Sequence, residues 1–286
     1  MSSVPKVWFI TGSSSGFGLA STELVLQRGD KVVATLRKPT VLADLVSKYP
    51  DTLLLLKLDV TQPEEVKLTF ATARERFGRI DVVLSNAGYG IVSEIEGTSE
   101  KNARGLFETN FWGASYVCRE AVRFFREENQ PVGGRLIQVS SVSGVASNPG
   151  SAWYCASKFA IEALAEALVV EVSPNWNIKV TIVEPGPFRT NCPTTNMVIE
   201  PIHPAYSDPA LPSMRTRNMV SNPNTTFTGD ATKFAEAIYK LVYLEDPPLR
   251  LPLHHFAVEA VRRKGRHLID TADTWASWSE DMYVKE

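Results

Sequence analysis

The sequence of 286 residues has few cysteines and almost no net charge. Its cysteines, Cys118, Cys155 and Cys192, are odd in number and lack the spacing of metal ligands. A disulfide framework is therefore not expected, whereas reduced thiols in a cytoplasmic compartment are. Thirty basic and 32 acidic residues leave a formal net charge of −2, which offers no basic surface to nucleic acid.

Long apolar runs are also missing. Runs such as residues 53–56 contain four apolar residues, far fewer than the roughly 20 that a membrane-spanning helix needs. Residues 1–6 lead directly into the apolar run 7–10, which leaves no room for a secretory signal peptide. We therefore expect a soluble cytoplasmic protein without a membrane span.

The overall composition is that of a globular protein, with 44% hydrophobic and 22% charged residues. Single α/β domains reach this length, so residues 1–286 are expected to form one domain with a sizeable core.

Seven short apolar or β-branched runs alternate with helical patterns along the chain. Several runs are apolar at consecutive positions, which is typical of strands buried on both faces of a parallel sheet. With right-handed crossovers, the pattern predicts an α/β fold of Rossmann type, doubly wound, with a seven-stranded parallel sheet and helices on both faces. The predicted strands are residues 7–10, 32–36, 53–58, 80–84, 136–139, 180–183 and, more weakly, 249–253.

Helical patterns lie between these strands. Thr61 is predicted as the N-cap of the second helix, with Pro63 and Glu64 in its first turn, and Gly78 is predicted to end it. The predicted helices are residues 18–28, 64–77, 102–128, 152–171 and 231–244.

The helical and strand patterns fail at residues 187–229, where seven prolines occur among apolar residues such as Met197 and Tyr206. A structureless loop of this length within a compact domain is usually functional or disordered. We expect residues 187–229 to form a variable substrate-binding lid. Residues 250–286 are expected to form a C-terminal strand and a helical extension.

A glycine-rich turn, Thr11-Gly12-Ser13-Ser14-Ser15-Gly16-Phe17-Gly18, follows the first predicted strand. Glycines let a backbone turn tightly and approach a pyrophosphate, and the helix that follows offers free N–H groups to that anion. The spacing Gly-x-x-x-Gly-x-Gly differs from the Gly-x-Gly-x-x-Gly of most dinucleotide-binding folds. The predicted cofactor contacts in this turn are Gly12, Ser14, Ser15, Gly16, Phe17 and Gly18.

This spacing resembles that of the short-chain dehydrogenase/reductase family, and further motifs of the family follow in order along nearly the whole chain. They are Asp59-Val60, Asn86-Ala87-Gly88, and Pro185-Gly186 followed by Phe188 and Thr190. The resemblance implies a nicotinamide cofactor and hydride transfer. It also implies that Asp59 contacts the adenine, that the Asn86 motif lies against the adenosine ribose and stabilises the sheet, and that Phe188 and Thr190 hold the nicotinamide end.

The end of the second predicted strand bears on which nicotinamide cofactor is bound. An acidic residue there would bind the ribose 2′-hydroxyl and favour NAD, but Leu36 occupies that position. Arg37 can bind a 2′-phosphate with its fork of donors, and Lys38 adds a point charge. We expect NADP(H) rather than NAD(H); the alternative is that both cations are solvated loop residues.

Tyr154 and Lys158 lie four residues apart on a predicted helix, so both side chains are on one face. A tyrosine has a pKa of about 10, too high for a base near neutrality. A lysine ammonium about 4 Å away contributes about 4 kcal/mol in an effective dielectric of about 20, which brings the phenol into working range. Tyr154 is the predicted proton donor or acceptor.

The resemblance adds two catalytic residues. Ser141 stands thirteen residues before Tyr154, the family's offset for its catalytic serine, which selects it over Ser140. Its hydroxyl would stabilise charge that develops on the substrate oxygen. Asn110 matches the family asparagine that positions a water next to the lysine; taken alone, a hydrogen bond within the helix explains it equally well.

The methionines and aromatic residues of the predicted lid suggest an apolar pocket for a hydrophobic ketone, aldehyde or alcohol. The chain is similar to the steroid- and retinol-dehydrogenase-like branch, including the pair Leu36-Arg37. By resemblance only, we expect a homodimer or homotetramer formed through the helices predicted at residues 102–128 and 152–171.

Other functions were weighed against this one. An inactive dinucleotide-binding sensor or scaffold protein would be expected to lose Ser141, Tyr154 or Lys158, and all three are present. An epimerase or dehydratase of the extended branch usually has a larger C-terminal region than the 100 residues after Gly186. A carbonyl reductase or alcohol dehydrogenase is the favoured hypothesis.

Two weaker features have structural explanations. The pair His254-His255 lies on a predicted strand, where consecutive side chains point to opposite faces, and no carboxylate–histidine cluster accompanies it, so no metal site is expected. Trp153, Trp275 and Trp278 are expected to be packing residues or to line a pocket.

Overall fold

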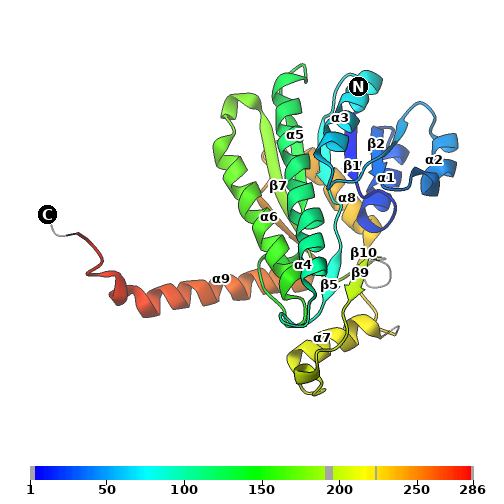
Figure 1. Ribbon diagram of the computed structural model, residues 1–286. Coiled ribbons are helices and arrows are strands. Elements are labelled where there is room, and N and C mark those ends of the chain that lie inside the picture. The colour runs from blue at the N-terminus through cyan, green and yellow to red at the C-terminus, as the bar shows by residue number, and fades with distance from the viewer. Residues whose placement is uncertain (1–3, 191–195, 223, 285–286) are drawn as a thin grey trace.

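The computed structural model describes residues 4–190, 196–222 and 224–284 and is built around a seven-stranded parallel sheet (Figure 1). The strands are β1 (Val7–Thr11), β2 (Lys31–Leu36), β3 (Leu53–Lys57), β4 (Val82–Ser85), β6 (Gly134–Val139), β7 (Ile178–Pro185) and β11 (Arg250–Leu253). Their order across the sheet is β11-β7-β6-β4-β1-β2-β3. The predicted fold class is confirmed, and each predicted strand belongs to this sheet.

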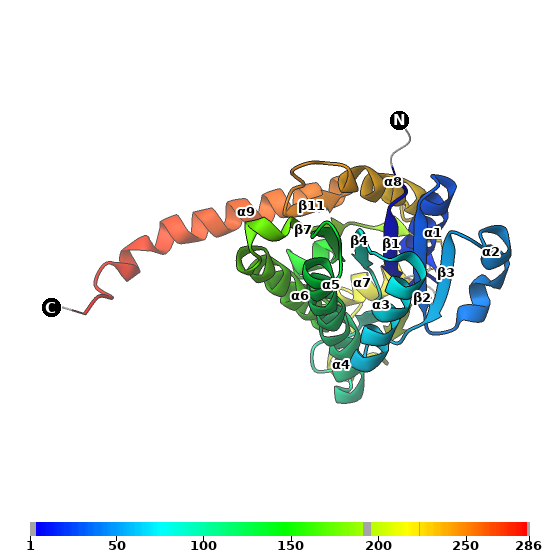
Figure 2. The same ribbon diagram turned by 90° about the horizontal axis from the view of Figure 1, so that it is seen from above.

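Helices cover both faces of the sheet (Figure 2). Helices α3, α5 and α6 lie on one face, and α1 and α8 lie on the other. The helices are α1 (Gly16–Gln27), α2 (Ala43–Lys48), α3 (Pro63–Phe77), α4 (Glu100–Phe107), α5 (Ala114–Glu127), α6 (Ala152–Glu171), α7 (Pro212–Ser221), α8 (Ala231–Val242) and α9 (His255–Trp275). None of the helices in the described part of the chain combines the length and apolar character needed to cross a bilayer.

Strand β1 shows why consecutive apolar residues predicted a doubly covered sheet. All five of its residues are buried. Phe9 stacks on Phe70 of α3, with ring centroids 4.2 Å apart, whereas Trp8 and Ile10 face the opposite layer with Phe234 of α8. Each such side chain contributes about 1.5–3 kcal/mol when fully buried, so this strand stabilises both layers at once.

The predicted helix at residues 102–128 is a continuous helical segment with one irregularity. Residues Glu108–Gly113 form a π-helical turn between α4 and α5. Such turns are rare in proteins, and those that occur are often found at functional sites. The turn contains Asn110, whose side chain it directs into the core, where only 1% of the residue is exposed.

The start of α3 corrects one sequence prediction. Its N-cap is Gln62 rather than Thr61, and Pro63 is the first helical residue. Thr61 instead donates its backbone N–H and its hydroxyl to Asp59 Oδ1, at 3.0 and 2.9 Å. Gly78 ends the helix as predicted, with φ +79°, a left-handed conformation that suits glycine.

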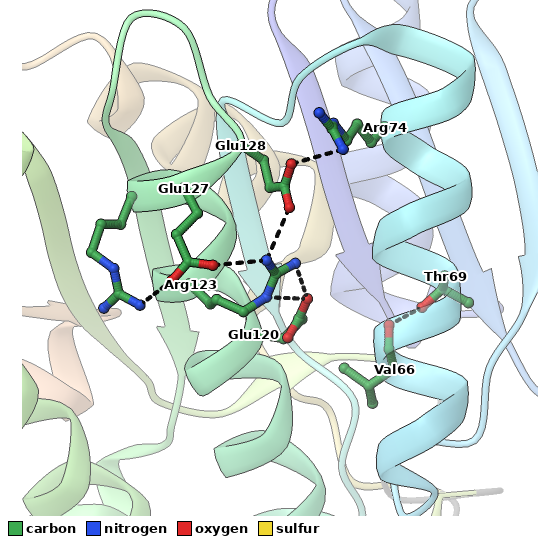
Figure 3. A network of polar contacts seen from close by, with 8 residues as sticks. Val66, Thr69, Arg74, Glu120, Arg123, Glu127 and Glu128 are labelled. Atoms are coloured by element: carbon green, nitrogen blue, oxygen red, sulfur yellow. Dashed lines mark hydrogen bonds and ion pairs between the residues drawn. The ribbon is translucent and has the colours of Figure 1, made fainter.

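A charged network joins α3 and α5 on the outside of the fold (Figure 3). Arg123 bonds Glu120, Glu127 and Glu128, at 2.7, 3.1 and 3.0 Å. Glu128 also pairs with Arg74 of α3 at 2.9 Å. These carboxylates raise the pKa of Arg123 above its ordinary value. The network links the C-terminal ends of the two helices.

The expectation of a structureless loop at residues 187–229 is wrong. The segment contains β8 (Phe188–Arg189), β9 (Met197–Ile199), α7 and one strand residue of β10 (Gly229–Asp230). Strand β9 pairs in parallel with β5 (Gly90–Val92), and β8 pairs with β10. Pro212 starts α7 at the first helical position, where its missing N–H is harmless. Prolines that suggested a loop therefore also mark helix starts.

A buried ion pair attaches this segment to the rest of the protein. Arg217 of α7 bonds Glu94 through two contacts of 2.8 Å, and the two residues are 4% and 3% exposed. The same guanidinium donates to the carbonyl oxygens of Glu200 and Pro201. The bonds from Arg217 lower the pKa of Glu94 to about 2, so the carboxylate stays ionised at any ordinary pH.

The last long helix, α9, projects away from the body (Figures 1 and 2). Only its first turns pack, through Ala257 and Ala260. Trp275 and Trp278, expected to pack or to line a pocket, are 52% and 71% exposed and do not line the cavity described below. Their rings pack edge-on against each other, with centroids 5.2 Å apart. Trp153 does pack, against Phe107 and the carbonyl of Ile95.

His254 does not lie on the strand that precedes α9. It caps the helix with φ +89°, accepting the N–H of Phe256. Its ring nitrogen Nε2 lies 2.9 Å from the hydroxyl of Thr228. Among residues 4–190, 196–222 and 224–284, no three His, Cys, Asp or Glu side chains gather closely enough to hold a metal ion.

The clamp between Glu94 and Arg217 yields the first prediction. In Glu94→Gln the guanidinium stays buried without a counter-charge, which should weaken docking of α7 by about 3–5 kcal/mol. Limited proteolysis with trypsin should then cut α7 much faster than in the wild type, while the rest of the protein resists. Glu100→Gln is the control, because the Glu100–Arg104 pair is exposed and contributes about 1 kcal/mol at most. Equal cleavage rates in the two variants would contradict the prediction.

Candidate cofactor and active site

A cavity of about 530 Å³ opens at the carboxyl ends of the central strands. In open α/β sheets this edge is where ligands bind. Most of the predicted cofactor residues line it: Gly12, Ser14, Ser15, Gly16, Phe17, Arg37, Asp59, Val60, Asn86, Ala87, Gly88, Tyr154, Lys158 and Thr190. Others that were predicted lie outside its lining: Gly18, Lys38, Pro185, Gly186 and Phe188.

The glycine-rich turn forms one end of the cavity. Gly12 and Gly16 adopt left-handed backbone conformations, with φ of +68° and +54°, which side chains disfavour. A Cβ on Gly18 would lie 2.2 Å from the carbonyl oxygen of Gly12. This glycine therefore packs behind the turn and lets α1 begin close to the cavity. The helix presents its first N–H groups there, which suits an anion.

The motif Asn86-Ala87-Gly88 ties β4 to the end of β1. The amide of Asn86 donates to the carbonyl of Thr11 at 2.9 Å, and the Thr11 hydroxyl accepts the backbone N–H groups of Asn86 and Ala87. These bonds hold two neighbouring strand ends at a fixed separation. The motif thus supports the cavity wall and joins the carboxyl ends of β1 and β4.

The end of β2 separates the two cations expected to favour a phosphate. Leu36 is buried and lines the cavity, and Arg37 is exposed and lines it too. Lys38 is exposed and lies outside the lining. The charge of Arg37 acts on Tyr89, which also lines the cavity and whose pKa is raised by burial. A single cation at the end of β2 is therefore directed at the cavity.

Tyr154 and Lys158 stand together on the first turns of α6, and both line the cavity. Lys158 is 5% exposed and donates from Nζ to the carbonyl oxygen of Val139, the last residue of β6, at 3.1 Å. The same nitrogen lies 5.8 Å from the centroid of the Tyr154 ring. The predicted pair thus faces the cavity from one side of the helix.

Ser141 lies in the turn directly after β6. Its hydroxyl accepts the backbone N–H of Ser143 at 3.1 Å, which starts the short helical turn Val142–Gly144. Ser141 itself is not among the residues that line the cavity, whereas its neighbour Ser140 is. Ser141 nevertheless lies at the same strand end as Lys158. It follows Val139 by two residues, and Lys158 donates to the carbonyl oxygen of Val139.

Asn110 stands behind the cavity wall and holds it in place. Its amide oxygen accepts the N–H of Tyr89 and its amide nitrogen donates to the carbonyl of Tyr89, at 3.0 and 2.9 Å. A Cβ on Gly88 would lie 3.0 Å from Asn110 Oδ1 and 3.7 Å from Lys158 Nζ. Asn110, Gly88 and Lys158 are therefore neighbours, as the family motif implies.

The residues predicted at the nicotinamide end divide into two groups. Thr190 lines the cavity, and a Cβ on Gly16 would lie 3.3 Å from it. Phe188 packs edge-on against Phe17, with centroids 5.1 Å apart. It therefore supports a ring that lines the cavity rather than lining the cavity itself.

Several cavity residues were missed from the sequence. Some could have been found by extending each motif to the adjacent strand end or loop: Thr35, Leu58, Tyr89, Thr109, Val139 and Ser140. Asn196, Met197 and Val198 belong to the predicted lid, but the sequence did not single them out as a wall of this cavity. This wall depends on the pairing of β9 with β5, which joins residues about one hundred positions apart.

Comparison with known proteins agrees with this geometry. The family model described as short chain dehydrogenase matches residues 6–197. An uncharacterized oxidoreductase of Schizosaccharomyces pombe is 38% identical over 264 residues, which is 92% of this chain and 87% of the relative. The 3-ketodihydrosphingosine reductase of Bacteroides thetaiotaomicron is 32% identical over 246 residues, 86% of this chain and 87% of the relative.

A solved structure extends the match to the whole fold. The crystal structure of a short-chain dehydrogenase from Streptomyces avermitilis is 36% identical, with a TM-score of 0.88 over 99% of this chain and 100% of that one. The two folds therefore agree over nearly the full length of both chains. The chain therefore belongs to the short-chain dehydrogenase family.

Proposed function

We propose that the protein is an NADP(H)-dependent oxidoreductase that interconverts a hydrophobic ketone or aldehyde and its alcohol, with Tyr154 as the general acid or base. The observation that carries the proposal is the placement of Tyr154 and Lys158 on the wall of the same cavity that the glycine-rich turn closes. A site for a phosphate-bearing cofactor and a proton-transfer group thus share one cavity.

The cavity fits a nicotinamide dinucleotide. Its size is suited to a large ligand, Gly12 and Gly18 leave no room for side chains at the turn, and α1 offers N–H donors to a pyrophosphate. When bound, the nicotinamide supplies or accepts the hydride. Asn86 and Asp59 would lie along the adenosine, and Thr190 would lie near the nicotinamide.

The protein's own groups move the proton. In reduction, the Tyr154 hydroxyl donates its proton to the carbonyl oxygen of the substrate as negative charge develops on it. The Lys158 ammonium, buried and held by Val139, stabilises the phenolate that remains. Ser141 donates a hydrogen bond to the same substrate oxygen. In oxidation each of these steps runs in reverse.

The proposed preference for NADP(H) rests on the end of β2. An acidic residue that would repel a 2′-phosphate is absent there, because Leu36 occupies that place at the cavity. Arg37 is the cation available to the phosphate, whereas Lys38 lies outside the lining. We therefore assign recognition of the 2′-phosphate to Arg37, with its bidentate fork of donors.

The proposed substrate class follows from the cavity wall that residues 196–198 form. Met197 and Val198 of β9 contribute apolar and adaptable side chains there. The pairing of β9 with β5 and the Glu94–Arg217 pair attach residues 196–222 to the rest of the protein, and we assign the role of the lid to residues 187–229. The Bacteroides relative is named as the reductase of a ketone, which agrees with a carbonyl substrate here.

We further propose that the protein forms a homodimer or homotetramer through α5 and α6. Trp112, just before α5, and Phe159 of α6 are large apolar residues that are 46% and 39% exposed. A second subunit docked on these helices would cover both side chains.

Tyr154→Phe tests the proton-transfer role. The variant keeps the ring and should bind NADPH normally, but it should lose about 10²–10⁴-fold in turnover of a carbonyl substrate, since general acid catalysis is worth that much. NADPH oxidation by purified protein against a panel of hydrophobic ketones and aldehydes measures it. Tyr283→Phe, at an 81% exposed position, is the control. Turnover by Tyr154→Phe at the rate of this control would contradict the mechanism.

The cofactor preference is tested by Arg37→Ala, alone and together with Leu36→Asp. Loss of a charge-assisted bond of about 1.5–3 kcal/mol should reduce kcat/KM for NADPH by about tenfold or more. The added carboxylate should move the preference further toward NADH. Lys38→Ala should leave the ratio of kcat/KM values unchanged, because Lys38 lies outside the cavity lining. An unchanged ratio in the double variant would refute the assignment.

The location of the cofactor is tested by Gly18→Ala. The added methyl group collides with the Gly12 carbonyl, so the turn must shift and the affinity for NADPH should fall by more than about tenfold. Nucleotide fluorescence reports the binding without any turnover. Gly265→Ala is the control, because no atom lies within 4 Å of a Cβ there and helix stability should rise by up to about 1 kcal/mol. Wild-type affinity in Gly18→Ala would place the cofactor elsewhere.

A further inference from the structure

A buried acid lies directly behind the proposed active site. Glu162 follows Lys158 by one helical turn on α6 and is 2% exposed. Its Oε1 accepts a hydrogen bond from the hydroxyl group of Ser140, with the two oxygens 2.5 Å apart. Ser140 lines the cavity and immediately precedes Ser141. The carboxylate therefore contacts the turn that carries Ser141 from the helix that carries Tyr154.

The turn is shaped around this carboxylate. A Cβ on Gly144 would lie 2.1 Å from Glu162 Oε1 and 2.6 Å from Ser140 Oγ. The backbone N–H of Gly144 in turn donates to the carbonyl of Ser141 at 2.8 Å. The carboxylate thus occupies the space that a side chain at position 144 would need, and its position is transmitted to the backbone of Ser141.

The second oxygen of Glu162 is held from the far edge of the sheet. Arg250 of β11 donates from the same NH1 group to Glu162 Oε2 at 2.6 Å and to Glu184 Oε1 at 2.5 Å. It also pairs with the half-exposed Glu166 at 2.9 Å. The carboxylate of Glu162 is therefore fixed at both oxygens, by a hydroxyl on one side and a guanidinium on the other.

Burial of these charged groups costs folding free energy. One guanidinium serves three carboxylates, and burial raises the pKa of Glu162 and of Glu184. Apolar residues at such positions are often at least as stabilising as buried ions. Stability alone thus gives little reason for an acid at position 162, and its contacts instead point toward geometry at the Ser141 turn.

We propose that Glu162 is a positioning residue, which acts through Ser140 and the Gly144 turn to set the distance between Ser141 and the Tyr154–Lys158 pair. The helix and the strand end that carry these groups are then joined at two points: Lys158 to Val139, and Glu162 to Ser140. This role rests on the proposed hydride-transfer function. Misplacement of a reacting group by about 1 Å can reduce a rate by about 10²-fold.

Two substitutions remove the contact from opposite sides. Ser140→Ala deletes the hydroxyl, and Glu162→Met keeps the size of the side chain without its polar atoms. Each should lower kcat by about ten- to a hundredfold while the dissociation constant for NADPH, from nucleotide fluorescence, stays within about threefold. The double variant should be no slower than the slower single variant, because both changes break one contact.

Three controls separate positioning from a general loss of structure. Glu162→Gln keeps polar contacts to both Ser140 and Arg250 and should restore kcat to within about threefold of the wild type. Glu166→Gln changes the half-exposed partner of Arg250. Because Ser140 bonds Glu162 rather than Glu166, the kcat of this variant should match that of the wild type. The isotope effect with 4-deuterated NADPH should grow in Ser140→Ala and Glu162→Met, because hydride transfer becomes slower, whereas a structural defect would lower only the melting temperature.

The outcomes are distinct. Glu162→Met with the kcat and isotope effect of Glu166→Gln would overturn the proposal. If Glu162→Met does not fold, Ser140→Ala decides, and wild-type kcat in that variant would overturn it. If none of the tested carbonyl compounds supports NADPH oxidation by the wild-type protein, the proposed function itself is rejected.

Discussion

The constraint on which the structure depends is that every strand of the central sheet runs in the same direction. Parallel strands bring their carboxyl ends to one edge, so loops that leave neighbouring strands of the sheet can meet at one cavity. The glycine-rich turn, the Asn86 motif and the Ser140–Ser141 turn are loops of this kind. The sheet itself thus brings residues that are far apart in sequence to one site, and no contact between their side chains is needed for this.

The sheet and its edge were predictable because their signals are local. The consecutive apolar residues of β1 predict burial on both faces, and all five residues of the strand are buried. The glycine-rich turn after it predicts a tight backbone turn, where Gly12 and Gly16 have left-handed conformations. Two predictions from local residue types were wrong. Prolines in the 187–229 segment predicted a loop, yet Pro212 begins a helix. Thr61 resembled an N-cap, but the carboxylate of Asp59 competes for its hydroxyl.

What the sequence could not supply is the set of contacts between distant elements. The ion pair of Glu94 with Arg217 spans 123 positions, and neither residue has a neighbour that suggests the other. The contact of Ser140 with Glu162 is similar: each lies beside a recognisable motif, but only the packing of α6 against the end of β6 brings them together. Such contacts decide how rigidly a site is held, which a motif does not encode.

The pairing of β5 with β9 gives the cavity a wall that comes from a late part of the chain. The family model ends at residue 197, within that wall. Under the proposed function, cofactor binding and substrate choice share this wall: a change in β9 that suits a new substrate would also alter the surface against which the cofactor would rest. Any redesign of the substrate pocket has to be judged by its effect on nucleotide affinity as well.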